Sequence, residues 1–503
     1  GIYIILSLFI FTAMTHFVAA DNSDSILNKV DVHTDKVEAF RDCLYDNPAM
    51  QSFRHSTSLN NIYVGYSGKW SDKAIRPEYG TGYNKWVGHI DAYIRKKAFT
   101  MWGKVLYTNG QVNSILYNES SDFDLVYPYV MADTVGGNTR QEYYYFLGGF
   151  SYQKNRFTLG VEGSYEARME YRTRDPRPKN LTGDLKAKVG ATYDIDNGNL
   201  VGLAVSARRY KQTNDVELYS ETSVPVIYHA TGLGTDYYRF RGVNTSTYYK
   251  GYSFGSVLDY ARKDKRGLFA SFGYDYLYLE KIISDLNELP MAEIKEHDQS
   301  FSLGYSGGTR TNAFGLLLTE RYTNRKGTEN IFGTAQSNIY PQISSITQYE
   351  RETLSAGIKG VYRHSISRAS WNIALSAGYT SLKELYAEPV RKIDVASLYA
   401  GLTLGGRFYT GQFLIMADAG IKYVGSTKSD ITGITSADGA LSLPVLQMYD
   451  YYANDRIVGK AKIEADYSVK DKYVIFASAN WEYSDYSLSN HYNMLEIAIG
   501  VKF

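Results

Sequence analysis

The sequence has few of the features that mark disulfide-bonded, redox-active or nucleic-acid-binding proteins. It contains one cysteine, Cys43, which excludes an intramolecular disulfide, a CxxC redox pair and a multi-cysteine zinc site. The 54 basic and 53 acidic residues leave a formal net charge of +1, so there is no electrostatic basis for binding nucleic acid. No HExxH motif or histidine pair at i, i+4 occurs. We therefore expect neither a metal nor a cofactor.

Long apolar runs are also missing beyond the first twenty residues, and the mean hydropathy is only −0.33. This argues against a bundle of membrane-spanning helices. Proline is scarce, with 10 residues, whereas tyrosine is abundant, with 48. A transmembrane β-barrel explains the low hydropathy and the aromatic excess together. Each of its strands needs only one apolar face, and aromatic side chains gather at both membrane interfaces.

Residues 1–20 resemble a secretory signal peptide. They are nearly all apolar from Ile2 to Met14, and small residues at Ala19 and Ala20 precede Asp21. The alternative is a membrane anchor, but the apolar run is shorter than a spanning helix requires.

Residues 21–59 form the only later segment without strand character. Val37, Phe40 and Leu44 recur at helical spacing, so we expect one short amphipathic helix that ends at Asn47-Pro48. We expect this helix to lie in the periplasm or to enter the barrel mouth as a plug.

Residues 60–503 consist of segments in which apolar and polar side chains alternate, which places them on opposite faces of a strand. The clearest are Arg156 to Arg172 and Arg456 to Val469. Short turns alternate with longer polar connections such as 109–139 and 213–245, which is typical of outer-membrane barrels. The predicted strand centres lie near residues 64, 89, 103, 147, 163, 189, 205, 255, 273, 303, 318, 357, 375, 401, 418, 462, 478 and 497.

The predicted fold is therefore all-β: a closed antiparallel transmembrane β-barrel of about eighteen strands, with sixteen to eighteen as the range. Closure is required because lipid offers no hydrogen-bond partner to an open sheet edge.

Charged side chains of both signs occupy the polar faces of these strands and are predicted to line the lumen. The lumen-lining candidates are Glu162, Glu166, Arg168, Glu170, Lys186, Lys188, Arg208, Asp418, Lys422, Lys460, Lys462 and Glu464. Two interpretations stay open: a solvated wall of paired charges, or a transverse field that orients a polar solute. Rings of a single sign are missing, so sharp ion selectivity is not predicted.

One long connection carries aromatic residues interleaved with arginine. The loop-binding candidates are Tyr228, Tyr237, Tyr238, Arg239 and Arg241. These side chains either stack on a ligand or partner protein, or fold the connection onto the barrel rim.

An enzyme is not expected. Two runs match G-x-S-x-G, Gly251 to Gly255 and Gly304 to Gly308, but both fall inside predicted strands and not at a strand-to-helix elbow. His89 and Asp91 share a strand face, without an identifiable reacting group within hydrogen-bond reach.

The last predicted strand ends on an aromatic residue. Its apolar face, the predicted membrane-insertion signal, consists of Leu495, Ile497, Ile499, Val501 and Phe503. This strand and the alternating segments before it make residues 60–503 resemble the outer-membrane β-barrels of Gram-negative bacteria, most of all those of Bacteroidota. The resemblance implies an outer-membrane location, contact with the lipid bilayer and lipopolysaccharide, and recognition of the last strand by the barrel-assembly machinery. A surface lipoprotein or other uptake partner is a further candidate partner.

Two named relatives fit less well. TonB-dependent receptors have about twenty-two strands and a large plug domain, for which residues 21–59 are too few. Fatty-acid transporters of the FadL type carry a short N-terminal plug but have fewer strands. Porin-like and FadL-like relations are therefore analogies of architecture.

The expected function is a diffusion channel or transporter for small polar solutes, with connections 109–139 and 213–245 narrowing the lumen. The alternative is a non-conducting receptor or platform, or the barrel component of a multi-protein uptake or secretion complex.

Overall fold

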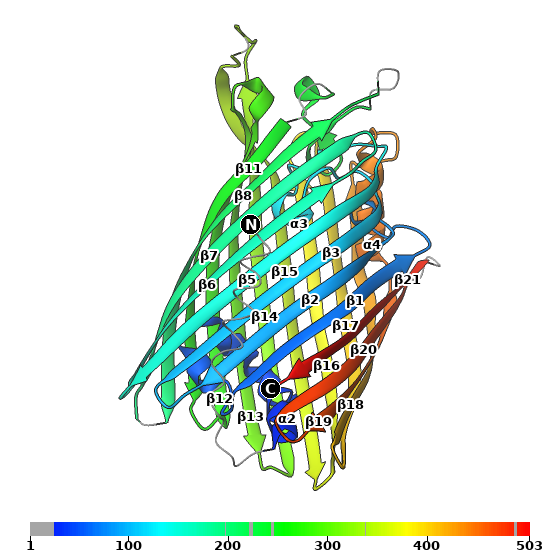
Figure 1. Cartoon of the computed structure of the whole chain (residues 1–503). Helices are drawn as coiled ribbons and strands as arrows, with labels where there is room; N and C mark the ends of the chain where they lie inside the picture. Colours follow the sequence, from blue (N-terminus) through cyan, green and yellow to red (C-terminus); the bar gives the residue numbers. More distant parts are fainter. Residues whose placement is uncertain (1–24, 197, 221–224, 243–245, 338, 487–489) are drawn as a thin grey trace.

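The computed structural model describes residues 25–196, 198–220, 225–242, 246–337, 339–486 and 490–503, so the predicted signal peptide lies outside the described residues. Eighteen antiparallel strands form one closed sheet, in which β1 pairs with both β2 and β21 (Figure 1). These strands are β1 (Leu59–Ser71), β2 (Gly82–Arg95), β3 (Phe99–Ile115), β5 (Gly137–Lys154), β6 (Phe157–Tyr171), β7 (Arg177–Asp194), β8 (Asn199–Glu217), β11 (Ser246–Arg262), β12 (Gly267–Ile283), β13 (Leu289–Gly308), β14 (Asn312–Phe332), β15 (Gln342–Ile366), β16 (Ala369–Tyr386), β17 (Arg391–Thr410), β18 (Phe413–Thr432), β19 (Arg456–Val469), β20 (Tyr473–Tyr486) and β21 (Asn490–Lys502).

The predicted fold class and strand number are confirmed, because each of the eighteen predicted centres lies in a different strand. The two ends of the barrel differ. At one end, the turn end, the connections have two to four residues. At the other, the loop end, lie the three longest connections, 116–136, 218–245 and 433–455.

Several strands reach further toward the loop end than predicted. β3 runs to Ile115 and β8 to Glu217, into segments expected to be loops. The physical reason is visible on β8, where the buried Asn214 amide donates to the backbone oxygen of Glu119, 2.5 Å away, in the connection that follows β3. The strand ends thus support folded connections and do not fray into solvent.

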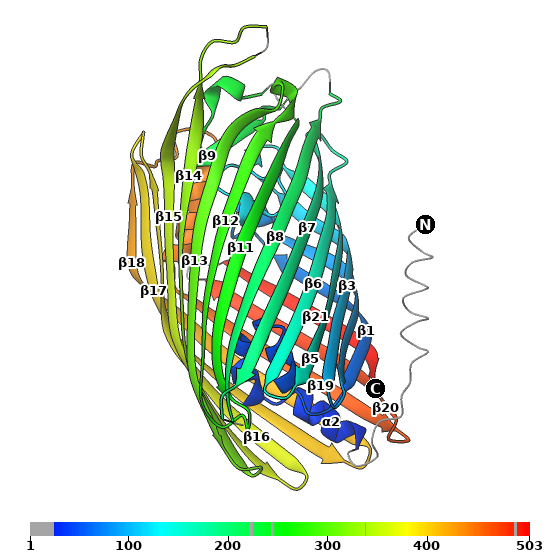
Figure 2. The same cartoon turned by 90° about the vertical axis from the view of Figure 1, so that its left-hand side faces the viewer.

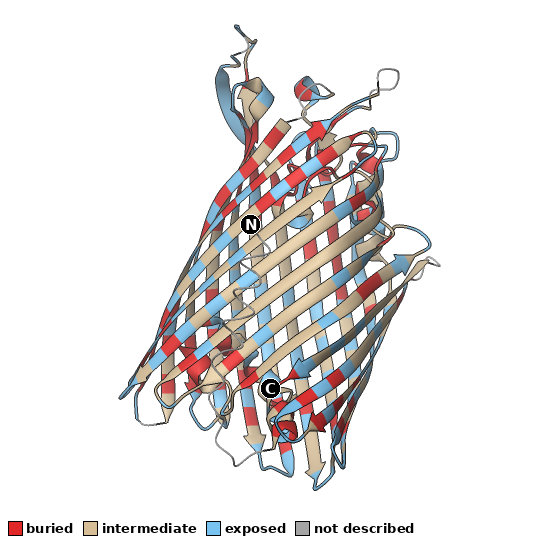
Figure 3. Cartoon of the chain, viewed as in Figure 1, coloured by how far each residue is buried: buried red, intermediate tan, exposed pale blue. Residues whose placement is uncertain are grey.

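The outward faces of the strands form an apolar belt. Val189 and Val205, which are cross-strand neighbours on β7 and β8, are 56% and 54% exposed, and Leu375 on β16 is 61% exposed. Figure 3 shows exposed positions alternating with less exposed ones along the strands. In a soluble protein such a belt would lie in water; around a closed barrel it matches a hydrocarbon environment. Among the described residues, no helix is long and apolar enough to cross a bilayer.

Residues 25–58, which we call the N-terminal segment, lie inside the turn end of the barrel (Figure 2). The segment contains α2 (Ile26–His33), η1 (Glu38–Asp46) and η2 (Met50–Phe53). The single predicted helix corresponds to the 3-10 helix η1, which ends just before Asn47-Pro48. Helix α2, which the sequence did not predict, begins at Ser25, whose hydroxyl accepts from the Asn28 amide.

The three longest connections fold together at the loop end, and we call them the cap. Connection 116–136 contains α3 (Phe123–Val126) and β4 (Met131–Ala132); connection 218–245 contains β9 (Tyr228–Gly232), β10 (Thr235–Asp236) and η4 (Tyr238–Phe240); and connection 433–455 contains α4 (Ser442–Ala453). Strands β4, β9 and β10 form a small separate sheet. Two shorter 3-10 helices, η3 (Pro77–Tyr79) and η5 (Ser284–Leu286), lie in neighbouring connections.

The apolar belt predicts that the loss of stability caused by a new charged side chain depends on which face of the strand carries it. Val205→Arg places a guanidinium on the outward face and should destabilise the barrel in lipid by about 2–4 kcal/mol near the bilayer midplane. Its neighbour Ser206 faces inward, because successive side chains of a strand point to opposite faces of the sheet and Val205 points outward. Ser206→Arg should therefore change stability little. Denaturant titration in phospholipid vesicles measures both, and equal costs would contradict a lipid-facing belt.

Candidate functional site

The cap closes the loop end of the lumen with a packed apolar core. Buried side chains from the cap pack against inward-facing side chains of the barrel wall. The cap contributes Val126, Tyr129, Val130, Leu233, Phe240, Val445 and Met448, and the wall contributes Tyr210, Tyr249, Leu279, Ile294, Tyr349, Leu382, Ile393 and Val395. This core joins the cap to the part of the wall that runs from β8 to β17.

Buried charges fasten the cap to the wall. The Arg172 guanidinium at the end of β6 is 1% exposed and lies 3.0 Å from a Glu119 oxygen and 3.2 Å from an Asp133 oxygen, both in connection 116–136. Arg325 of β14 donates to the backbone oxygens of Asp124 and Tyr127, at 2.7 and 2.6 Å. Removing one partner of a buried ion pair typically costs about 3–5 kcal/mol, so the cap is held firmly.

The N-terminal segment is fastened by small apolar clusters with the wall and by ion pairs, several of which are partly solvated. Asp31 pairs with Arg407 of β17, and Asp35 pairs with Arg363 of β15. Lys36 lies 2.9 Å from Asp418 of β18, and Asp46 pairs with Lys188 of β7 on another part of the wall. Because several of these side chains are partly solvated, each pair stabilises the docked segment less than a buried pair would.

Beside the N-terminal segment lies a polar chamber of about 440 Å³. Its lining comes from Asp42, Tyr45, Asp46, Gln51 and Arg54 of the segment and from Tyr145, Leu147, Glu162, Ser164, Lys186 and Lys188 of β5, β6 and β7. Three carboxylates, three cationic groups and two phenol rings therefore face one space. The volume is within the range of small-molecule sites, and the lining offers both donors and acceptors.

Lys188 is the central charge of the chamber. Its ammonium pairs with Asp46 of the segment and lies 3.3 Å from a Glu162 oxygen on β6. Glu162 also accepts a 2.8 Å hydrogen bond from the Trp102 indole. The neighbouring Lys186 has no ion pair or hydrogen bond of its own among the described residues, so it is the cationic group most available to a solute.

The lumen-lining candidates lie on inward faces, and most pair with neighbours. Glu166 accepts from Arg168 and Tyr143, and Arg208 pairs bidentately with Asp184. Further pairs are Glu170 with Gln141, Lys460 with Glu482, Lys462 with Glu464 and Glu464 with Lys502. Lys422 stacks on the Tyr399 ring, 3.9 Å from its centroid. The paired-wall interpretation therefore describes most of this set.

Three of these candidates reach beyond the wall. Lys188 and Asp418 hold the N-terminal segment, and Arg168 pairs with Asp122 of the cap. Their partners and the cap anchors Arg172 and Arg325 could not be identified from the sequence alone. The signal that could have indicated these contacts was an excess of carboxylates in residues 31–46 together with arginines on the predicted inward faces of the strands.

The loop-binding candidates divide into two groups. Tyr237 donates to the backbone oxygen of Asn330, and Arg239 donates to that of Phe332, 2.5 Å away, so both fold the connection onto β14. Arg241 instead lies over the rings of Tyr228 and Tyr238, at 5.2 and 5.0 Å. Tyr238 is 78% exposed, which leaves one face of this stack open to solvent.

The features considered for catalysis have structural roles. The His89 ring stacks on Tyr63, with centroids 4.6 Å apart. Both G-x-S-x-G runs lie within strands, β11 and β13. Within the described ranges, no group of three or more His, Cys, Asp or Glu side chains could hold a metal ion.

On the last strand, Ile497, Ile499 and Val501 face outward, with exposures of 48%, 58% and 36%. Phe503 exchanges backbone hydrogen bonds with Asn60 of β1, so it lies at the closure of the barrel. Recognition of this strand by assembly machinery stays a prediction.

Two histidines stack inside the N-terminal segment. The rings of His33 and His55 are 3.9 Å apart and nearly parallel, and both meet the edge of Tyr93 on β2. Burial, opposed by a hydrogen bond with Thr57 and helped by nearby Arg54 and Lys265, lowers the pKa of His33 to about 4. Burial, His33 and the same two cations lower the pKa of His55 to about 2. Both rings are therefore neutral near pH 7.

A family of unknown function, DUF6850, matches residues 48–503 of the chain. A search of curated proteins gave no match. Among solved structures, the BauA ferric preacinetobactin receptor from Acinetobacter baumannii is 9% identical, with a TM-score of 0.36 over 88% of this chain and 80% of that one. The F3-3 variant of the FrpB iron transporter from Neisseria meningitidis is 6% identical, with a TM-score of 0.43 over 88% and 81% of the two chains. Similarities of this size carry no argument about function.

The ion pairs of the N-terminal segment predict that removing them releases the segment from the barrel wall. Replacing Asp31 and Asp35 together by Asn leaves Arg407 and Arg363 without carboxylates, which should cost about 1–3 kcal/mol per pair. Trypsin should then cleave within the segment at least roughly tenfold faster. Asp42→Asn is the matched control, because Asp42 pairs with Arg54 of the same segment and not with the wall. Equal cleavage of all three proteins would contradict this anchoring.

The histidine stack predicts that docking weakens in acid. Released His33 and His55 have ordinary pKa values near 6.5, above their values of about 4 and about 2 in the docked state. The released state thus binds more protons, so docking is strongest above pH 6.5 and weakens as pH falls from there toward about 4. Hydrogen exchange of residues 25–58, corrected for intrinsic rates, measures this. Replacing both histidines by Gln should flatten the pH dependence, whereas His364→Gln should leave it unchanged.

Proposed function

We propose that this chain, which belongs to the DUF6850 family, is a gated transporter for small polar solutes in the outer membrane of a Gram-negative bacterium. The turn end would face the periplasm and the loop end the outside. The observation that carries the proposal is the chamber, a space of about 440 Å³ lined by charges of both signs, in a barrel whose two ends hold the N-terminal segment and the cap. A permanently open diffusion channel would need neither of them.

A solute bound in the chamber would affect how the N-terminal segment docks on the wall. Five of its lining residues belong to the N-terminal segment and six to the wall, so a solute in it touches both. A solute carboxylate or phosphate would compete with Asp46 for Lys188 and approach Lys186. A solute ammonium or hydroxyl would find Glu162 and Asp42. Occupancy would therefore exchange contacts between segment and wall for contacts with the solute, which lowers the cost of undocking.

The N-terminal segment is the more mobile of the two closures in this proposal. It consists of three short helices held by several partly solvated ion pairs and by small apolar clusters with the wall, whereas the cap shares one larger apolar core with the wall and contains the buried cluster around Arg172. Local opening generally begins where buried apolar contacts are few.

A second candidate function is a non-conducting surface platform or receptor. The packed cap favours it, because an apolar core sealed to the wall is costly to open. The exposed Tyr228–Arg241–Tyr238 stack would then belong to a docking surface for a partner.

A disulfide lock tests the transporter. Ser52 of the segment and Ser151 of β5 have hydroxyl oxygens 2.6 Å apart, so cysteines at both positions can bridge. In a Cys43→Ala background, planar-bilayer recording in KCl should show voltage-driven openings of the unlocked barrel. Oxidation of the Ser52→Cys, Ser151→Cys protein should abolish them, and reduction should restore them.

The Cys43→Ala protein with Ser52→Cys alone is the control, and its openings should not respond to oxidant. Unlocked protein that inserts correctly and stays silent at every voltage would contradict the transporter and leave the platform. Openings that persist after complete oxidation would show that the segment is not the gate.

A further inference from the structure

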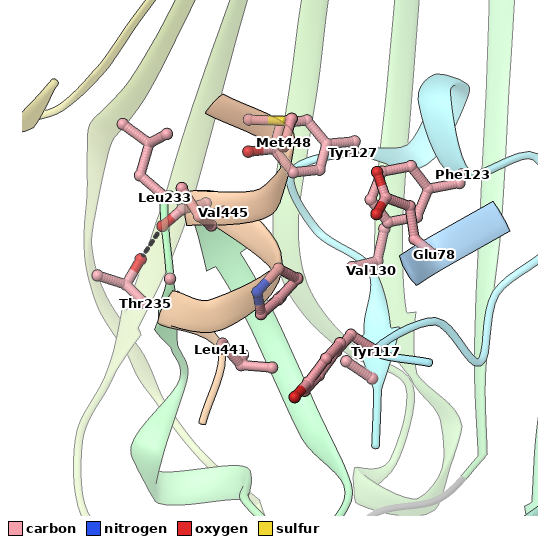
Figure 4. A pocket seen from close by; sticks show the side chains of 15 residues that line it. Glu78, Tyr117, Phe123, Tyr127, Val130, Leu233, Thr235, Leu441, Val445 and Met448 are labelled. Carbon is pink, nitrogen blue, oxygen red and sulfur yellow. Dashed lines mark hydrogen bonds between the residues drawn. The ribbon is translucent and has the colours of Figure 1, made fainter. Parts of the chain in front are cut away.

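A second, separate crevice lies at the loop end. It is lined mainly by apolar side chains from three connections of the cap, with Glu78 of η3 on one side and α4 on the other (Figure 4). Its lining includes Phe123, Tyr127 and Val130 of connection 116–136, Leu233 of connection 218–245, and Leu441, Val445 and Met448 near α4. The free volume is about 40 Å³, and none of the chamber-lining residues belongs to it.

Glu78 is the only carboxylate of the crevice, and it is incompletely satisfied. Its side chain is 3% exposed, and one oxygen, Oε1, lies 2.5 Å from the Arg76 guanidinium. The other, Oε2, is buried and has no hydrogen-bond partner among the described residues. A buried carboxylate oxygen without a donor is costly, so a group that supplies one is favoured there.

The charges around Glu78 favour a cation as that donor. Arg76 is shared between Glu78 and Asp124, whose nearer oxygen is 3.9 Å away. Asp124 is 67% exposed, so its charge is largely solvated, and it also accepts from the Tyr79 hydroxyl. Arg76 is thus shared with a second carboxylate and leaves Oε2 of the buried Glu78 without a donor. A neutral donor would satisfy Oε2, whereas an ammonium would form a stronger, charge-assisted hydrogen bond.

The size of the crevice limits what else the ligand carries. A volume of about 40 Å³ corresponds to roughly three water-sized probes. A space of this size favours a small aliphatic group over an intact aromatic ring. Val445, Met448 and Leu441 offer such a group apolar contacts on the side opposite Glu78 (Figure 4).

We propose that this crevice binds a small aliphatic primary amine, or the amine-bearing aliphatic end of a larger molecule, with its ammonium on Glu78 Oε2. A ligand seated there contacts the three cap connections and the connection that carries Glu78. It therefore binds where the parts that close the barrel from the loop end converge. Binding at this site does not require transport through the chamber, so the two proposals fail independently.

Three probes with one carbon skeleton test the site: isobutylamine, isobutanol and isobutyrate. Ligand-observed saturation-transfer NMR with the whole protein in lipid nanodiscs compares them, with empty nanodiscs as the blank. Isobutylamine should bind best and isobutyrate worst. Glu78→Gln keeps the shape of the side chain but loses its charge, and should weaken isobutylamine binding about tenfold to a hundredfold while changing isobutanol little.

Two further variants complete the test. Val445→Phe fills the crevice and should abolish binding of both isobutylamine and isobutanol. Glu217→Gln is the matched control, because Glu217 accepts from Tyr219 at the rim, outside the crevice, and its loss should change nothing. Ala230→Val fills the same crevice with a smaller change, should the first filling variant misfold. Equal binding of amine and carboxylate, binding that survives both filling variants, or a signal equal to that of empty nanodiscs would overturn the proposal.

Discussion

The hydrogen-bonded pairing of β1 with β21 is the contact on which the rest of the structure depends. It joins Asn61 to Lys502 and Ser71 to Tyr492 along eleven consecutive pairs, so the sheet has no open edge. Lipid cannot hydrogen-bond an exposed backbone, so a membrane-spanning sheet must close. Closure with eighteen strands then creates a second problem, because a barrel of this width encloses a lumen too large for wall side chains to fill.

The chain fills that lumen in two physically different ways. At the loop end, the cap brings an apolar core and a few deeply buried charges, of which Arg172 is the clearest. At the turn end, the N-terminal segment meets the wall through small apolar clusters and partly solvated ion pairs, and it leaves a polar chamber beside it. The larger apolar core belongs to the cap, and the smaller clusters belong to the N-terminal segment.

Much of the barrel could be predicted from the sequence because its signal is local. Alternation with a period of two assigns each side chain a face without knowledge of its neighbours, so the strand positions and the inward set that includes Glu162 and Asp418 were found. The closures could not be predicted in this way. Asp31 and Arg407 are 376 positions apart, and nothing in either local pattern couples them. The same holds for the cap, where Arg325 reaches Tyr127 across 198 positions.

The role of the loop-binding candidates could not be predicted from the sequence either. Interleaved tyrosine and arginine side chains have similar composition whether they bind a partner or hold a loop to the rim. Only the three-dimensional position separates Tyr237, which donates to the backbone of β14, from Tyr238, which stays exposed.

Strand β6 connects the two closures. Along its inward face, Glu162 meets Lys188, which holds the N-terminal segment, and Arg168 meets Asp122 of the cap. Glu166 lies between them and accepts from Arg168 at 2.8 Å. A paired strand in a closed sheet cannot shift without breaking its ladder, so any coupling along it must come from charges that change partners. A solute that replaces Asp46 as the partner of Lys188 also weakens the ion pair between Lys188 and Glu162. Because electrostatic interactions are stronger at reduced dielectric, this change alters the interactions of the next charged side chains on the same face of β6.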